Sequence, residues 1–380
     1  MNNPNCLRFE RLEVPLEYIA IYGAGLTTMT EMLLQRRESG NFASRVYPVT
    51  KLLKVVEAVY AAGGSYEDAL RDTGMAAADL GSPTTRVSID QMLTIYRNAI
   101  GLSRGAADFA MRTGLSVHPT VYGMYGFAIL SSICFRNTVS FATKYHDLAD
   151  PLVHLTFEET DTAGIWRFIP LAHPAVNADL FRFIVELQFG IVLSLQRDLM
   201  GPDFRPAECR FTFEDDPRLD YRSMLGSTVS FGQPTNELIF DRNWLDKTPE
   251  YGNGPSYAVT LKMCDELLED LESRKGAAGQ VRRVLLANLG RSMSSDLVAV
   301  RLGITTRTLR RKLREEGLTF RQITDNLRTR LAEKYLRETD MTVEDIAAAL
   351  SFSDAANFRH AFRRWKGQSP QQFRLTAAPD

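Results

Sequence analysis

Near its carboxyl end the chain reads Ala299-Val-Arg-Leu-Gly-Ile-Thr-Thr-Arg-Thr-Leu-Arg-Arg-Lys-Leu313, and it repeats this pattern as Ala347-Ala-Ala-Leu-Ser-Phe-Ser-Asp-Ala-Ala-Asn-Phe-Arg-His-Ala-Phe362. The second copy carries one extra residue in its turn. Each copy predicts a helix, a tight turn and a second helix, because Gly303 suits a left-handed turn and Thr305 can cap the helix that follows. This is the helix-turn-helix pattern, whose second helix enters the major groove of DNA.

The second helix of the first copy has a basic face. At about 100° per residue, Leu309 and Leu313 lie together on its inner side. The opposite arc consists of Thr306, Arg307, Arg310, Arg311 and Arg314. Four arginines without one acidic residue exceed what solubility needs, and arginine pairs bidentately with guanine. The alternative is a solvated basic face that has no partner.

The matching arc of the second copy is less basic. Phe358 and Phe362 face inward, and the arc itself consists of Ala355, Ala356, Arg359, His360 and Arg363. Small alanines allow close approach to DNA, while the two arginines can reach phosphates or bases. We therefore expect the first copy to contribute more direct base readout.

A long helix is predicted between the two copies, over residues 320–337, with Thr319 as its cap. Such a helix is about 27 Å long. It can hold two reading helices near one DNA turn apart, roughly 34 Å, so a single chain can read two adjacent major-groove segments.

Charge separates the chain into two parts. Residues 277–376 hold 19 Lys and Arg against 10 Asp and Glu, a net charge of +9, whereas residues 1–276 carry a net charge of −9. A basic module on an acidic body is typical of a protein that binds a polyanion. The polar stretch 272–279 marks the boundary.

Composition excludes several classes. The 380 residues are 44% hydrophobic and 24% charged, which indicates an ordinary globular protein of two or three domains. The cysteines, Cys6, Cys134, Cys209 and Cys264, form no Cys-x-x-Cys pair and predict neither a zinc ribbon nor a disulfide scaffold. The amino-terminal sequence lacks a signal-peptide pattern, and the apolar stretch 14–34 contains acidic residues, so we expect no membrane span.

The basic module resembles the DNA-binding domain of the AraC/XylS transcription regulators. The resemblance rests on the motifs Leu302–Gly317, Ile346–Asp354 and Phe362–Arg374. It implies base-reading positions at Arg307, Arg310 and Arg311 in the first unit and at Ala355, Ala356, Arg359 and His360 in the second. Two residues depart from the family pattern. Ser351 replaces the usual Gly, which predicts a left-handed Ser or an altered turn, and His360 replaces the usual Arg and adds a pH-sensitive charge.

The rest of the chain predicts an α+β domain. Helical spacing is found over 46–62, 65–73, 88–100, 178–199 and 257–271, and strand patterns over 152–157, 165–169, 208–213, 228–231 and 238–240. The predicted fold is thus an α+β sensor domain followed by an all-α domain with two helix-turn-helix units joined by a long helix. The predicted bounds are an extension at 1–45, a sensor or dimerisation domain at 46–274, a linker at 275–281 and a DNA-binding domain at 282–376, with the two units at about 294–315 and 342–365.

The body also resembles the arabinose-binding-type sensor domain of one AraC subgroup, that of the ornithine-utilisation regulator. This resemblance rests on residues 120–127, 209–213 and 229–240. It implies a sensor or dimerisation body without fixing a ligand. Candidate ligand contacts are Tyr122, Tyr125 and Trp166, with Arg167 or Arg182 to hold an acid group. The alternative places these aromatics in the core and these arginines on the surface. The histidines follow no metal-ligand spacing, and we expect neither a metal nor a cofactor.

The predicted function is sequence-specific DNA binding by a transcription regulator, an activator controlled by a small molecule or by self-association. Its expected partners are promoter DNA, RNA polymerase, a second copy of the chain and an unidentified effector, all in the cytoplasm with the nucleoid. One alternative is a ligand-independent regulator whose body only dimerises. Another is an enzyme, such as an alkyl-transfer repair protein, but Cys134 and Cys209 lack the surroundings of a nucleophile and no Walker or Gly-x-Ser-x-Gly motif occurs.

Overall fold

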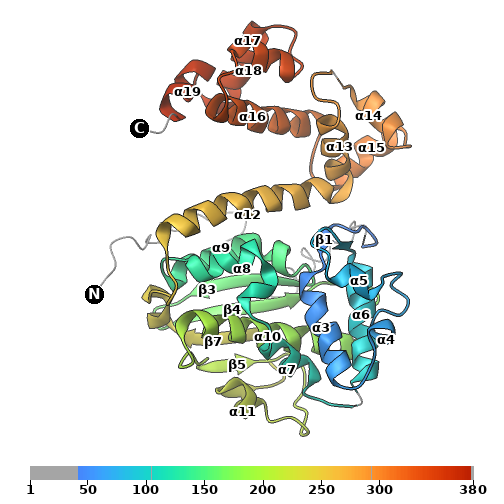
Figure 1. Ribbon diagram of the computed structural model, residues 1–380, viewed down its shortest axis with the longest axis vertical. Helices are drawn as coiled ribbons and strands as arrows, with labels where there is room; N and C mark the ends of the chain where they lie inside the picture. The colour runs from blue at the N-terminus through green and yellow to red at the C-terminus, as the bar shows by residue number, and fades with distance from the viewer. Residues whose placement is uncertain (1–41, 104, 292, 378–380) are drawn as a thin grey trace. The chain divides into compact units, whose positions relative to one another are not determined.

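The computed structural model describes residues 42–103, 105–291 and 293–377 (Figure 1). Most of the predicted extension at 1–45, including Cys6, lies outside the described residues. Two compact units share the described chain, and the division between them falls at Leu271 and Glu272, inside helix α12 (Gly254–Arg274). Each unit has its own hydrophobic core, as expected for separate domains.

The first part of the body is helical. A two-residue ribbon, in which β1 (Tyr47–Pro48) pairs with β2 (Arg86–Val87), precedes and follows the first helices. The prediction of a helix from residue 46 was wrong at its start, because Pro48 lacks a backbone N–H and disfavours helical geometry at Tyr47. The helices are α3 (Thr50–Ala61), α4 (Tyr66–Ala69), α5 (Ala77–Leu80), α6 (Ile89–Leu102) and α7 (Phe109–Leu115).

A five-stranded sheet forms the second part of the body, in the order β3-β4-β7-β5-β6. Its pairs are antiparallel except for β5 with β6. The strands are β3 (Val153–Glu159), β4 (Ala163–Pro170), β5 (Glu208–Arg210), β6 (Thr228–Ser230) and β7 (Asn236–Asp241). The hairpin of β3 and β4 confirms the alternating pattern in the sequence. Two short helices accompany the later strands: α11 (Tyr221–Leu225) lies between β5 and β6, and the 3-10 helix η2 (Arg242–Asp246) follows β7.

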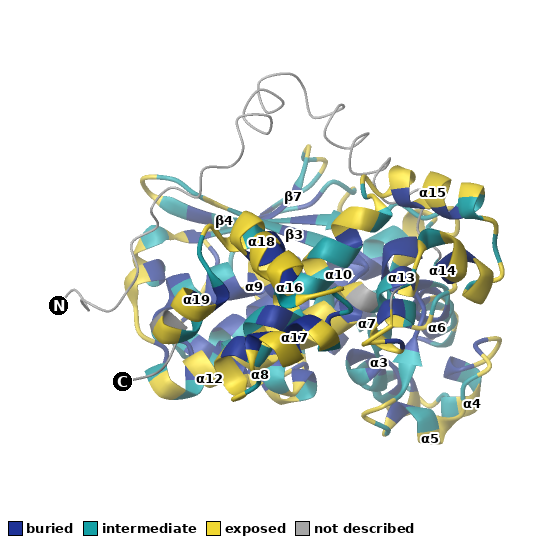
Figure 2. Cartoon of the chain, turned by 90° about the horizontal axis from the view of Figure 1, so that it is seen from above, coloured by how far each residue is buried: buried dark blue, intermediate teal, exposed yellow. Residues whose placement is uncertain are grey.

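Helices cover one face of this sheet. They are the 3-10 helix η1 (Pro119–Tyr122), α8 (Met124–Ser131), α9 (Phe135–Ala149) and α10 (Ala178–Met200). Helix α10 is mostly buried (Figure 2) and packs closely on α7. Glycines permit this approach, because a Cβ on Gly114 would lie 2.3 Å from the carbonyl oxygen of Leu187. No helix of the described residues is long and apolar enough to cross a membrane.

The second unit is all helical. It contains α13 (Gly276–Leu286), α14 (Ser295–Arg301), α15 (Thr306–Glu315), α16 (Phe320–Glu338), α17 (Val343–Ala349), α18 (Ala355–Lys366) and α19 (Pro370–Ala377). The two helix-turn-helix units are therefore α14–α15 and α17–α18, with α16 as the long helix between them. Each of the two helix-turn-helix units has a separate small core within the second compact unit.

The predicted linker at 275–281 is helical instead. Its small residues Ala277 and Ala278 and its aliphatic Val281 are buried in the first core of the second unit, so this stretch belongs to the folded unit. The carboxylate of Glu316, the residue just after α15, caps the start of α13, the helix that this stretch begins. It accepts the backbone N–H of Ala277 at 2.6 Å and that of Ala278 at 3.0 Å.

The two turns use different residues for the same backbone geometry. Gly303 has a φ of 68° in the turn between α14 and α15, and Ser351 has a φ of 59° in the turn between α17 and α18. The left-handed Ser expected from the sequence is thus observed. This conformation costs a residue with a Cβ roughly 1–2 kcal/mol, so the second turn is strained.

We predict that Ser351→Gly stabilises the second unit by up to about 1 kcal/mol, because relief of left-handed strain exceeds the entropy cost of glycine. Thermal unfolding of the full chain, followed by the fluorescence of Trp365, measures the change. The matched control is Gly303→Ser, which should destabilise by a similar amount, since open space surrounds that position. If Ser351→Gly melted at a lower temperature than the unsubstituted protein, the left-handed backbone at Ser351 would not be strained.

Candidate nucleic-acid interface and internal cavity

Helix α15 exposes its basic arc. Leu309 and Leu313 are buried and fix the helix against the first core. The side chains of Arg307, Arg310, Arg311 and Arg314 are exposed on the other side. Thr306, the remaining predicted residue, is half-buried and donates its hydroxyl to Asp296 at 2.6 Å. Thr306 therefore fastens α15 to α14, while the arginines face solvent.

The four arginines differ in their partners. Arg311 forms an ion pair with Glu315, one turn further along α15, at 2.6 Å. Among the described residues, no ion pair is recorded for Arg307, Arg310 or Arg314. Three guanidinium groups are thus free to bind an anionic partner, and the fourth must exchange Glu315 for it.

Helix α18 presents the corresponding arc of the second unit. Phe358 and Phe362 are buried in the second core. The predicted residues Ala356, Arg359, His360 and Arg363 are exposed, and Ala355 is half-buried. Arg359 pairs with Glu344 of α17 at 2.7 Å. His360 borders a surface groove against α16 that Arg321, Arg328 and Arg364 also line.

Inside the body, the sheet and helices α8, α9 and α10 enclose a cavity. The cavity has a volume of about 50 Å³. Three predicted ligand contacts, Tyr122, Tyr125 and Trp166, line this cavity together although they come from η1, α8 and β4. Most of the wall is apolar, from side chains such as Phe135 and Ile191.

Four polar side chains of the cavity wall lack hydrogen-bond partners among the described residues. The atoms are both ring nitrogens of His146, the indole Nε1 of Trp166, Oε1 of Gln188, and both amide atoms of Gln196. Each of these side chains is at least nine-tenths buried. An unpaired buried polar group costs roughly 1–3 kcal/mol. Such a cluster therefore requires bound water or a ligand to supply the missing hydrogen bonds.

Sequence reasoning missed His146, Gln188 and Gln196. The signal was present in α10, where Gln188 and Gln196 are eight residues apart on a face otherwise made of Ile191, Val192 and Leu195. Polar residues on the buried stripe of an amphipathic helix need a partner.

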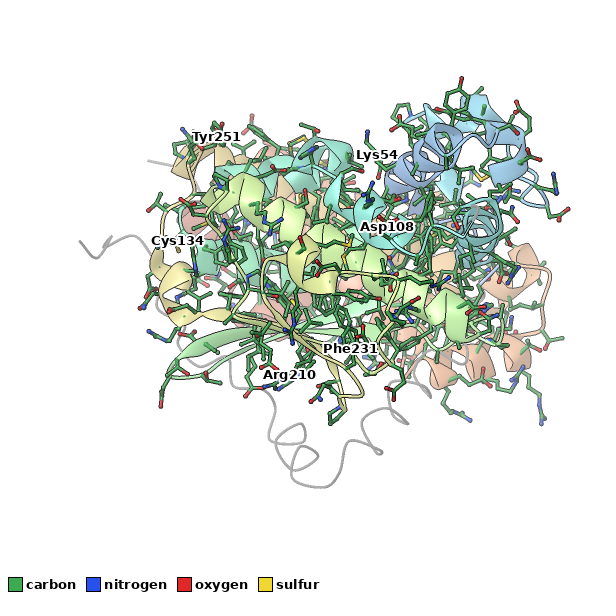
Figure 3. All side chains as sticks on the ribbon, turned by 90° about the horizontal axis from the view of Figure 1, so that it is seen from below. Lys54, Asp108, Cys134, Arg210, Phe231 and Tyr251 are labelled. Carbon is green, nitrogen blue, oxygen red and sulfur yellow. The ribbon has the colours of Figure 1, made fainter. Side chains whose placement is uncertain are left out.

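The two predicted anion-binding arginines lie outside the cavity. Strand residues alternate between faces, so Arg167 points to the opposite side of the sheet from Trp166. There it pairs with Glu158 at 2.6 Å and with Glu237 at 2.7 Å. Glu237 also pairs with Arg210 at 3.2 Å, so the outer face of the sheet carries a ladder of ion pairs (Arg210 is labelled in Figure 3).

Arg182 belongs to a different polar cluster. It donates to Glu186 at 2.8 Å and to the hydroxyl of Tyr221 at 2.6 Å, and it lies over the ring of Phe213. Burial raises the pKa of the Glu186 carboxyl. The guanidinium of Arg182 therefore neutralises a buried acid of its own domain.

The charged groups at the cavity wall are neutralised. The Asp150 carboxylate pairs with Lys51, and both side chains are buried. Burial also lowers the pKa of His146 to about 4, an effect that the Asp150 and Asp147 charges only partly offset. His146 is consequently an uncharged imidazole at neutral pH.

Neither free cysteine has the character of a nucleophile. Burial raises the pKa of Cys209 to about 12 and that of Cys264 to about 11. An alkyl-transfer cysteine needs a lowered pKa. In the part of the chain that the structure describes, no group of three or more His, Cys, Asp and Glu side chains could hold a metal ion.

Two families of known proteins match separate parts of the chain. The family described as "Arabinose-binding domain of AraC transcription regulator, N-term" matches residues 63–248, and the "Helix-turn-helix domain" family matches residues 298–376. The chain is 28% identical over 339 residues to the ornithine utilization regulator of Pseudomonas aeruginosa, covering 88% of this chain and 98% of the relative.

A second relative is more similar over a shorter span. The transcriptional regulator VqsM of Pseudomonas aeruginosa is 30% identical over 270 residues, which covers 70% of this chain and 82% of VqsM. Among solved structures, the transcriptional regulator CdpR of Pseudomonas aeruginosa matches at 20% identity and a TM-score of 0.39, covering 70% of this chain and 86% of CdpR. These relatives are named transcriptional regulators.

We predict that His146 makes the body less stable in acid. The unfolded imidazole titrates near 6.5 and the folded one near 4, so the unfolded state takes up the proton first as the pH falls. The contribution of the uncharged His146 to the free energy of unfolding is fully present above pH 6.5 and is lost as the pH falls from 6.5 to 4. The expected loss between pH 7 and pH 5 is about 2 kcal/mol.

Urea unfolding at the two pH values, followed by the fluorescence of Trp166 and Trp244, measures this loss. His146→Phe should abolish it, whatever its effect on stability at pH 7. An equal pH dependence in the variant and the unchanged protein would show that other groups cause it.

Proposed function

This chain belongs to the AraC family of transcription regulators, and from that premise we propose that α15 and α18 bind two successive major-groove segments of one promoter duplex. The observation that carries this proposal is the exposed arginine arc of α15, backed by the buried Leu309 and Leu313. A helix held in this way offers its guanidinium groups to base edges and phosphates.

The two helices take unequal parts in this proposal. Arg307, Arg310 and Arg311 of α15 read bases, because arginine recognises guanine O6 and N7 with two hydrogen bonds. On α18, Ala355 and Ala356 permit close approach, and Arg359, His360 and Arg363 contact bases or the backbone. Thr306 and Arg314 border the first interface. Arg311 and Arg359 each release a carboxylate when they bind, which favours a guanine that offers two acceptors in return.

We further propose that the cavity of the body holds the effector. Tyr122, Tyr125 and Trp166 form its aromatic wall, and the unpaired polar atoms of His146, Gln188 and Gln196 supply directional contacts. A ligand that binds one arrangement of the chain more tightly shifts the population toward it. Arg167 and Arg182, with acidic partners of their own, have no part in this proposed site.

Other partners complete the proposed function. As an activator, the DNA-bound chain contacts RNA polymerase, and it works in the cytoplasm on the nucleoid because its target is chromosomal promoter DNA. We assign no enzymatic activity to it, since the raised pKa values of Cys209 and Cys264 oppose nucleophilic chemistry.

Self-association of the body is also part of the proposal. Helix α12 exposes an apolar stripe at every fourth residue, with Val259 at 61%, Met263 at 41% and Leu267 at 42% exposure. Residues at this spacing share one face of a helix. When two such stripes pack antiparallel about a twofold axis, Met263 meets Met263 of the second copy and Val259 meets Leu267.

We predict that Met263→Lys weakens self-association about tenfold or more, because a charge would be buried at the centre of the twofold contact. Light scattering during gel filtration over a range of concentrations measures the mass. The matched control is Tyr60→Lys, which adds the same charge at another exposed apolar position and should leave the dimer intact. A monomeric unsubstituted protein at all concentrations would contradict the stripe's role.

We predict that Arg311→Ala loses roughly 1–3 kcal/mol of binding to a cognate operator and relaxes base preference at one position. Binding to a library of randomised duplexes measures both effects. Arg283→Ala removes an exposed arginine of α13 and should change neither. An equal loss on every sequence would make Arg311 a phosphate contact instead, and Glu315→Gln should strengthen binding because it releases the Arg311 guanidinium.

A further inference from the structure

The chemistry of the cavity wall narrows the class of molecule that it can hold. This inference rests on the proposed effector site. Ligand recognition in a buried site requires that each polar atom left without a protein partner meets a complementary atom of the ligand. The charges, donors and acceptors of the wall can therefore be matched one by one.

The first criterion is net charge. In the part of the chain that the structure describes, the cavity-lining residues include no lysine or arginine, and Asp150 is the acidic one. Its carboxylate is occupied by the Lys51 ammonium and by the backbone N–H of Leu152 at 2.9 Å. A ligand carboxylate would lie beside Asp150 without a free cation, and a ligand ammonium would have to displace Lys51. Both carry the full cost of burying a charge.

The arginines that sequence analysis assigned to an acid group strengthen this criterion. Arg167 lies on the other side of the sheet with Glu158 and Glu237, and Arg182 is held by Glu186 and Tyr221. Neither lines the cavity.

The second criterion is the pattern of donors and acceptors. The indole Nε1–H of Trp166 is a donor that needs an acceptor, and Oε1 of Gln188 is an acceptor that needs a donor. Both amide atoms of Gln196 and both ring nitrogens of the uncharged His146 are unpaired, so each of these two side chains needs an acceptor and a donor at once. A carboxamide supplies this pair, with its C=O as acceptor and its N–H as donor.

The third criterion is shape. The wall is otherwise formed by aromatic and aliphatic side chains such as Tyr125, Phe135 and Leu195, which favour an apolar body next to the polar group. Since the cavity has a volume of only about 50 Å³, the ligand is slender or pushes lining side chains apart.

We propose that the cavity binds an uncharged small molecule that carries a carboxamide, or an equivalent neighbouring acceptor and donor, on a short apolar body. Its polar contacts are Gln196, Gln188, His146 and Trp166. Carboxylates and amines of the same shape are excluded. Two features therefore select a neutral amide over a carboxylate or an amine of the same shape. One is the set of hydrogen bonds to the amide, and the other is that no lining residue offers a charge that lacks a partner.

Matched ligands test this proposal on the full chain. Pentanamide, pentanoate and pentylammonium form one set of equal shape, and benzamide, benzoate and benzylammonium form a second. We expect the amide of at least one set to raise the melting temperature of the body by a few degrees at about ten times its Kd. The charged members should give no shift, and calorimetric titration should give the same order of affinity.

Two variants link the response to the cavity. Gln196→Leu keeps the size of the side chain but removes both polar atoms, and it should abolish the response to amides. Gln280→Leu makes the same change at an exposed position of α13, far from the cavity in sequence, and should keep the response. If Gln196→Leu does not fold, Gln188→Leu replaces it, with an expected loss of at least fivefold in affinity.

Three results would overturn the proposal. They are an equal or larger shift with a charged member, no shift with any of the six compounds at about 20 mM, where a ligand with a Kd of about 1 mM nearly saturates its site, and an unchanged amide response in the cavity variants. DNA binding by the same samples separates this failure from that of the proposed function. If the amides give no response but the same samples bind DNA, the proposed ligand class is wrong and the proposed DNA-binding function is unaffected.

Discussion

The burial of two large apolar side chains behind each reading helix is the interaction on which the nucleic-acid interface depends. Leu309 and Leu313 fix α15, and Phe358 and Phe362 fix α18. Because these anchors hold one face of each helix in a core, the opposite face must be solvent-exposed, and it carries the arginines. The two anchors lie in different cores, so each helix is positioned by its own small domain, and α16 supplies residues to both.

Much of this arrangement could be predicted from the sequence, because it follows from local rules. The internal repeat, the period of 3.6 and the cap at Thr305 predict α14 to α18, and the alternation of β3 and β4 predicts their hairpin. The polar stretch at 275–281 misled because alanine and glycine occur in linkers and in closely packed helices alike. Only the surroundings of Ala277, Ala278 and Val281 decide between these, and those surroundings are set by contacts distant in sequence.

The cavity shows the same limit more clearly. Aromatic residues were assigned to it by type, and three of them line it together, but Arg167 was placed beside Trp166 although neighbouring residues of a strand face opposite sides. Whether an arginine is available for a ligand depends on its acidic neighbours, and Glu237 and Glu186 come from elements far along the chain. The spacing of the two glutamines on the buried stripe of α10 indicates that they need partners, but the structure alone shows that Oε1 of Gln188 and both amide atoms of Gln196 have none among the described residues.

The cap that Glu316 provides has a mechanical consequence. Lys275 directly precedes α13, and the first backbone N–H groups of that helix donate to the carboxylate of Glu316, which immediately follows α15. The start of α13 is thereby tied to the end of the first reading helix by two hydrogen bonds within the second unit. Helix α13 and α15 consequently form one packed piece, and α18 joins that piece through α16.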